Sequence, residues 1–225
     1  MTYKHLSFVS LFAVAALSAS AQRNVENFNF GWQFHRGNID VAAINTSDGS
    51  WETINVPHDF QISQPWVAPA ANESEDNSDG ASNFKSRLSA RGFKEMGDGW
   101  YVKTYTPAAD MKGRRILLDF EGIMYVGDVY LNGKRIGGTD YGYLGFDIDV
   151  SKLLKYGQAN TIAVHASTSG PLNSRWYTGG GLYRDVKIVS TPADIYFVRH
   201  PLYVTTTDNH LVNLQVEVAN YTKQN

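Results

Sequence analysis

The sequence predicts an all-β protein built as a β-sandwich. Short runs rich in β-branched and aromatic residues recur between turn residues, a spacing typical of two packed sheets. Only Ser151–Gly157, which begins with a capping Ser and ends with a Gly, is typical of a short helical turn. The clearest strands are expected over residues 100–106, 115–121, 125–131, 160–166 and 183–190.

One hairpin is indicated by its turn. Asn132 and Gly133 separate the apolar run 129–131 from the run 134–136. Both residue types tolerate the positive φ that a type I′ turn requires. The sequence therefore predicts two antiparallel neighbours joined at these two residues.

The first 21 residues have the pattern of a secretory signal peptide. Lys4 and His5 precede an apolar run of 12 residues from Leu6 to Leu17, and Ala19-Ser20-Ala21 follows as a cleavage sequence. The run is shorter than the ~20 residues that cross a bilayer. We expect cleavage before Gln22 and export to the periplasm or the exterior; a buried N-terminal helix is the alternative.

Composition excludes several classes of partner. Without the first 21 residues, whose only Lys, Arg, Asp or Glu is Lys4, 19 basic and 22 acidic side chains remain, a formal charge of −3. No basic excess indicates binding to nucleic acid or to an anionic membrane. The chain has no Cys, so an exported form relies on its core rather than on disulfides. Aromatic residues make up 13% of the chain; most are expected in the core, and a few could stack on sugar rings.

Two stretches differ from the predicted sandwich. Residues 67–99 combine acidic, basic and small polar residues, and a loop of this length is usually either functional or disordered. Within it, Glu75–Ser86 imitates the start of a calcium loop but has Ser where a ligating Glu is expected, so no metal is predicted. After Pro192, apolar residues alternate with polar ones over 212–218, which indicates a half-buried strand of a second β domain.

The most informative segment is Trp176–Val186. Three consecutive glycines, Gly179–Gly181, follow an aromatic pair and precede a predicted strand. Glycine permits positive φ and close backbone approach, so this is expected to be a turn pressed against another part of the chain. Trp176 and Tyr177 would lie at a rim of the sandwich, either as a wall of a sugar site or as packing against a neighbouring domain.

Taken together, four motifs resemble the N-terminal sugar-binding domain of glycoside hydrolase family 2, which includes β-galactosidases and β-glucuronidases. They are Trp176–Val186, Val56-Pro57-His58-Asp59-Phe60, Gly99-Trp100-Tyr101 and Leu131-Asn132-Gly133. The resemblance covers roughly residues 26–225, and Phe60 stands where the family usually has Trp. It implies a jelly-roll-like (galactose-binding-like) β-sandwich over 23–192, followed over 193–225 by the truncated start of an immunoglobulin-like β-sandwich.

The resemblance also implies a substrate-binding set. In some β-galactosidases a loop of this domain hydrogen-bonds the terminal sugar, and Asp140 is the candidate for that role, against the alternative of a solvated turn residue. The loop before the glycine turn supplies the rest of the set, namely Asn173, Arg175, Trp176 and Tyr177. Amide and guanidinium groups can donate to sugar hydroxyls, and a carboxylate can accept from two of them.

No catalytic residue is predicted in this chain. Retaining glycosidases place two carboxyl groups ~5–5.5 Å apart, and no Glu here has a context that pairs it with another. His58 and Asp59 lack an accompanying nucleophile. Arg184 and Asp185 are expected to form structural hydrogen bonds. In the family both catalytic glutamates belong to a later barrel, and we expect that barrel to be absent here.

We therefore interpret the chain as a signal peptide, 1–21, and the N-terminal fragment of an exported β-galactosidase-like hydrolase. A stand-alone carbohydrate-binding module and a scaffold β-protein without a ligand stay open as alternatives. The expected partners are a carbohydrate substrate and the protein's own catalytic domain, with no cofactor, no nucleic acid and no membrane. A homo-oligomer of the intact protein is left open, as are the sugar and its linkage.

Overall fold

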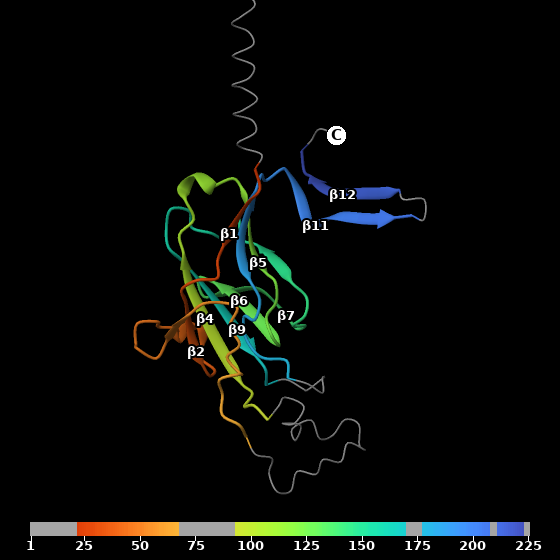
Figure 1. The fold of residues 1–225 in the computed structure, drawn as a ribbon. Coiled ribbons are helices and arrows are strands. Elements are labelled where there is room, and N and C mark those ends of the chain that lie inside the picture. The colour runs from red at the N-terminus through yellow and green to blue at the C-terminus, as the bar shows by residue number, and fades with distance from the viewer. Residues whose placement is uncertain (1–21, 68–92, 170–176, 208–210, 223–225) are drawn as a thin grey trace, which may run out of the picture.

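The computed structural model describes residues 22–67, 93–169, 177–207 and 211–222. Two antiparallel sheets face each other, and a two-stranded hairpin forms a third sheet (Figure 1). The smaller facing sheet has the order β1-β10-β5-β8, from Asn24–Asn27, Val186–Thr191, Arg115–Phe120 and Phe146–Asp149. The larger has the order β3-β2-β4-β9-β6-β7, from Glu52–Ile54, Trp32–Arg36, Asp98–Tyr105, Asn160–Ser167, Val126–Leu131 and Lys134–Thr139. The predicted all-β sandwich is confirmed.

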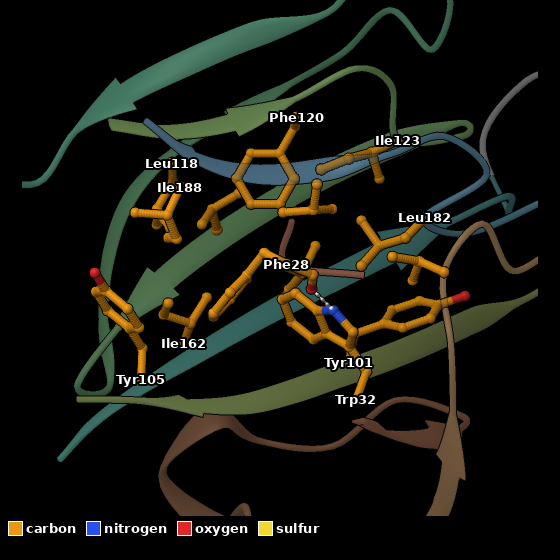
Figure 2. Packing of buried hydrophobic residues seen from close by; sticks show 14 of the residues in the cluster. Phe28, Trp32, Tyr101, Tyr105, Leu118, Phe120, Ile123, Ile162, Leu182 and Ile188 are labelled. Carbon is orange, nitrogen blue, oxygen red and sulfur yellow. Dashed lines mark hydrogen bonds between the residues drawn. The ribbon is translucent and has the colours of Figure 1, made fainter. Parts of the chain in front are cut away.

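The core lies between the two sheets. Figure 2 shows side chains of the smaller sheet, such as Leu118, Phe120 and Ile188, meeting Trp32 and Tyr101 of the larger one, all almost fully buried. Each such side chain contributes ~1.5–3 kcal/mol by leaving water. The Trp32 indole N–H donates to the Phe28 carbonyl at 2.8 Å, so the largest core residue leaves no buried donor unpaired.

A smaller apolar cluster covers the outer face of the larger sheet. Trp100 and Val102 on β4 and Ala163 on β9 are buried there. Residues of the segment that follows β2, including the short 3-10 helix η1 (Val41–Ala43), pack against them. A second 3-10 helix, η4 (Ala109–Met111), precedes β5. No helix in the described part of the chain has the length and apolar character needed to cross a membrane.

The predicted hairpin turn is confirmed. Asn132 and Gly133 have φ of 52° and 81°, and Leu131 on β6 pairs with Lys134 on β7. Four of the five expected strands agree with the structure to within two residues at each end. The fifth, expected from Tyr183, begins only at Val186. The preceding residues instead form separate bonds, among them the Tyr183 N–H to the Gly181 carbonyl at 3.0 Å.

The segment after Pro192 forms β11 (Ile195–Thr206) and β12 (Val212–Asn220), which pair only with each other among the described strands. A register irregularity interrupts β11 between Phe197 and Leu202. On one face of this hairpin, Leu202 lies opposite Val216 and Val204 opposite Leu214, all of them exposed. The boundary near residue 193 and the immunoglobulin-like character of this segment stay predictions.

Candidate functional site

Two segments far apart in sequence interlock at one end of the sandwich. The His58 N–H donates to the Leu182 carbonyl at 2.7 Å, and the Phe60 N–H donates to the Gly180 carbonyl at 3.0 Å. These bonds place the segment 56–61, which follows β3, alongside the glycine turn 179–181. We call this paired region the 58–182 junction.

The three glycines are required by close contacts within the junction. Gly179 and Gly181 have φ of 75° and 108°, a range that L side chains rarely adopt. A Cβ on Gly179 would lie 2.7 Å from an Asp59 carboxylate oxygen, and one on Gly181 would lie 2.0 Å from the Tyr101 hydroxyl. The middle glycine is equally confined, by Phe60 and by Thr168 on the far side. The expectation of a turn pressed against another segment is therefore confirmed.

Asp59 is the centre of the polar contacts in the junction. Its Oδ1 accepts from the Gly180 N–H at 2.8 Å and from the Gln61 N–H at 3.0 Å. Its Oδ2 accepts from the Tyr177 hydroxyl at 2.7 Å. The carboxylate therefore joins the aromatic residue before the glycine turn to the backbone on both sides of the junction.

Tyr177 is half-buried, with its hydroxyl directed at a carboxylate. Burial and the hydrogen bond to Asp59 raise the pKa of Tyr177 well above its ordinary value. The hydroxyl therefore stays protonated throughout the physiological pH range, and it donates its hydrogen bond to Asp59. Among the predicted substrate-binding residues, Tyr177 is the one that the structure places in the junction; Asn173, Arg175 and Trp176 lie outside the described residues.

A half-buried histidine and a buried tyrosine form a second polar contact in the junction. His58 Nδ1 lies 2.9 Å from the hydroxyl of Tyr101, a fully buried residue of β4. Burial lowers the pKa of His58, and burial raises the pKa of Tyr101 far above its ordinary value. Because the phenol keeps its proton and the imidazole is driven toward its neutral form, we infer that Tyr101 donates to Nδ1. We interpret this pair as a structural contact of the junction.

Asp140 lies at the same end of the sandwich but outside the junction. It follows β7, whose last residue Thr139 pairs with Gly127 near the start of β6. The side chain is exposed, and no hydrogen bond or ion pair joins it to Tyr177 in the described part of the chain. The exposed carboxylate is accessible to solvent or to a ligand. Its role in sugar binding stays a prediction.

The turn after Asp140 is tied to the junction through Met124. A Cβ on Gly142 would lie 2.4 Å from the Met124 sulfur, so this turn packs closely on that side chain. The Met124 N–H in turn donates to the Gly181 carbonyl at 2.8 Å. The Tyr183 hydroxyl adds a bond to the Gly142 carbonyl at 2.9 Å. The Asp140 turn and the glycine turn are therefore parts of one packed rim.

The base of the long predicted loop also lies near this rim. The Val67 N–H donates to the Phe93 carbonyl at 2.8 Å, and the Lys94 ammonium lies 4.0 Å from the centre of the Trp66 ring. These contacts join the two ends of the loop. Residues 68–92, including the calcium-like segment, lie outside the described residues. Within the described ranges, no group of three or more His, Asp or Glu side chains could hold a metal ion.

The other charged motifs have structural partners, as expected. Asp185 accepts from the Asn29 side-chain amide at 2.9 Å, and Arg184 reaches the carbonyl of Tyr143 at 3.4 Å. Glu121 forms an ion pair with Lys187 of β10. Its carboxylate is thus neutralised by a neighbouring strand, which is a structural use of this residue.

Two polar side chains beside the junction have no hydrogen-bond partner among the residues that the structure describes. Gln61 is fully buried, and neither its amide nitrogen nor its carbonyl oxygen is hydrogen-bonded; the Thr178 hydroxyl is also buried without a partner. Such groups are uncommon in folded proteins and often mark sites of function or of bound water. Sequence reasoning did not single out either residue. It also missed the Asp59–Tyr177 bond, since nothing in a single sequence relates residues 118 positions apart.

Comparison with known proteins relates this chain to a family of glycosyl hydrolases. The model of the glycosyl hydrolase 2 galactose-binding domain-like family matches residues 88–175. A beta-galactosidase of Bacteroides ovatus is 29% identical over 218 residues, which is 95% of this chain and 24% of the relative. A beta-glucuronidase of Formosa agariphila is 32% identical over 197 residues, which is 82% of this chain and 18% of the relative.

Solved structures of glycoside hydrolases are also similar to this chain. A beta-glycosidase from Bacteroides vulgatus superimposes with a TM-score of 0.71 at 28% identity, over 89% of this chain and 25% of that structure. A glycosyl hydrolase family 2 member from Bacteroides cellulosilyticus gives a TM-score of 0.64 at 30% identity, over 81% of this chain and 22% of that structure. The chain thus spans about a quarter or less of the length of these similar proteins.

Proposed function

The chain carries the galactose-binding-like domain of glycoside hydrolase family 2, and on this premise we propose that it forms the non-catalytic, sugar-facing part of a retaining glycoside hydrolase. The substrate class we propose is a β-galactoside or a β-glucuronide, following the names of its relatives. By analogy with the family, an acid/base Glu and a nucleophilic Glu act in a separate catalytic domain. The role of this chain is to shape one wall of the substrate site.

The packed rim is the observation that carries the proposal. Tyr177 is held by Asp59 at the same end of the sandwich as the exposed Asp140. An aromatic ring and an exposed carboxylate at one rim suit a sugar, which offers both an apolar ring face and hydroxyl donors. The ion pair of Glu121 with Lys187 supports a structural use of that carboxylate.

The test compares the natural full-length protein with the 225-residue chain. We expect the full-length protein to release nitrophenol from at least one aryl β-glycoside and the 225-residue chain to release none. Turnover by the shorter chain that is abolished by one Glu substitution would overturn the assignment of catalysis to another domain. Reading the coding frame beyond Asn225 tests the alternative: a stop codon there would favour a stand-alone carbohydrate-binding module.

We further propose that the protein is exported and that residues 1–21 are removed. The apolar run and the small residues before Gln22 support this. N-terminal sequencing of protein recovered outside the cytoplasm should begin at Gln22. Recovery of protein that still begins at Met1 from the cytoplasm alone would contradict it.

A further inference from the structure

The 58–182 junction contains a carboxylate that the proposed sugar site does not explain. Asp59 does not lie in the set of residues expected to meet a sugar, yet it accepts three hydrogen bonds, one of them from Tyr177. We propose that Asp59 is a positioning residue: its carboxylate holds the ring of Tyr177 in the orientation in which that ring contacts the sugar. This inference rests on the proposed function of the rim.

The two carboxylate oxygens of Asp59 have different hydrogen-bond partners. Oδ1 is occupied by the N–H groups of Gln61 and Gly180, which fix the carboxylate to both segments of the junction. Oδ2 is then directed at the Tyr177 hydroxyl. Hydrogen bonds to an ionised acceptor are about twice as strong as neutral ones. The ring is therefore attached to a carboxylate that is itself held by backbone.

The surrounding backbone allows the carboxylate little movement. A Cβ on Gly179 would lie 2.7 Å from Oδ2, so the carboxylate already packs directly on the turn. The bonds from His58 to Leu182 and from Phe60 to Gly180 hold the backbone on each side of Asp59. A substitution at residue 59 should consequently displace the Tyr177 side chain, because the backbone around residue 59 cannot rearrange to compensate.

This arrangement decides how Tyr177 can recognise a sugar. Its hydroxyl already donates to Asp59, and the raised pKa keeps it protonated. The group left for a ligand is the ring, which is only half-buried. The structure thus assigns Tyr177 a stacking role and assigns its orientation to Asp59.

The experiment uses the full-length protein and four variants: Asp59→Asn, Tyr177→Phe, the double variant, and Asp48→Asn as a control. Asp48 accepts from Ser50 in an exposed turn, so its variant matches the chemistry of the change outside the rim. We expect each rim variant to lower kcat/KM about tenfold, mainly by raising KM, a loss typical of one hydrogen bond to an ionised group. The double variant should be no worse than the worse single variant. Asp48→Asn should match the wild type.

A positioning role and a merely structural one differ in these measurements. Unchanged KM with a lowered melting temperature, or fully additive effects of the two rim variants, would overturn the proposal. Hydrogen exchange supplies a readout that does not need activity: Asp59→Asn should speed exchange in peptides covering residues 177–182. If the wild type hydrolyses no glycoside, the proposed function fails, while the exchange data still decide whether Asp59 holds Tyr177. Unchanged exchange in Asp59→Asn would reject the positioning role.

Discussion

Arg199 on β11 and Asp119 on β5 form an ion pair between the hairpin and the sandwich. The Arg199 Nη2 and Nε groups both donate to Asp119 Oδ1, at 2.7 Å and 3.2 Å. Arg199 lies in the irregular part of β11, next to His200 with its φ of 53°. The interruption of β11 therefore coincides with a residue that connects the hairpin to the sandwich.

We predict that this ion pair fixes the hairpin to the sandwich. Both side chains are largely buried, at 24% and 14% exposure, so the pair should be worth somewhat more than a surface pair, about 1 kcal/mol. A double-mutant cycle of Arg199→Ala and Asp119→Ala, followed by urea unfolding, measures this coupling. Coupling near zero would show that the hairpin is held by other contacts, such as Arg115 against the Tyr196 ring.

Stability should decrease in mild acid because of His58. Burial lowers the pKa of His58 in the folded state below the ordinary value of 6.5. Between these two pKa values the unfolded chain therefore binds more protons than the folded chain. The stabilising contribution is complete above pH 6.5 and is lost as the pH falls toward the lowered pKa. Melting temperatures between about pH 7.5 and pH 5.5 should show this decline, and His58→Gln should reduce it. An equal decline in both proteins would assign the effect to other groups.

Gly181 should be far less tolerant of substitution than Gly133. Both have positive φ, but a Cβ on Gly181 would meet the Tyr101 hydroxyl at 2.0 Å, whereas nothing lies within 4 Å of one on Gly133. Gly133→Ala should therefore cost about 1 kcal/mol from backbone conformation alone, and Gly181→Ala at least about 2 kcal/mol more because Tyr101 must move. Chemical denaturation of both variants tests the difference. Equal losses would mean that the junction can relax.

The 225-residue chain should associate through its C-terminal hairpin. Leu214 and Val216 are 66% and 51% exposed and lie on an apolar face, while Gln215 between them points to the opposite face. Burying such side chains contributes about 1.5–3 kcal/mol each. Leu214→Lys should reduce association in light scattering, and the control Gln215→Lys should reduce it much less. Equal effects of the two changes would indicate that charge alone, rather than the apolar face, controls association.

Asp140→Ala in the full-length protein tests the other half of the rim. Loss of a hydrogen bond from a sugar hydroxyl to this carboxylate should lower kcat/KM by about tenfold, equivalent to roughly 1.4 kcal/mol. Because Asp140 is exposed, the melting temperature should stay unchanged. Unchanged kinetics on natural and aryl substrates would reject a sugar-binding role for Asp140 and would favour the alternative of a solvated turn residue.

Local sequence patterns determined much of this protein. Runs rich in β-branched and aromatic residues predicted β4, β5, β6 and β9, and Asn132-Gly133 predicted its hairpin, because strand and turn preferences depend on neighbouring residues. The short strands β1, β2, β3 and β8 were not predicted. The run Gly179–Gly181 predicted a close contact with another segment but did not identify that segment. Tertiary structure alone decided that this segment contains Asp59, that Asp59 binds Tyr177, and that β10 begins at Val186 rather than Tyr183. The contacts of Asp59 with Tyr177 and Gly180 join residues 118 and 121 positions apart. Such contacts follow from how the sheets pack and leave no periodic signal in the chain.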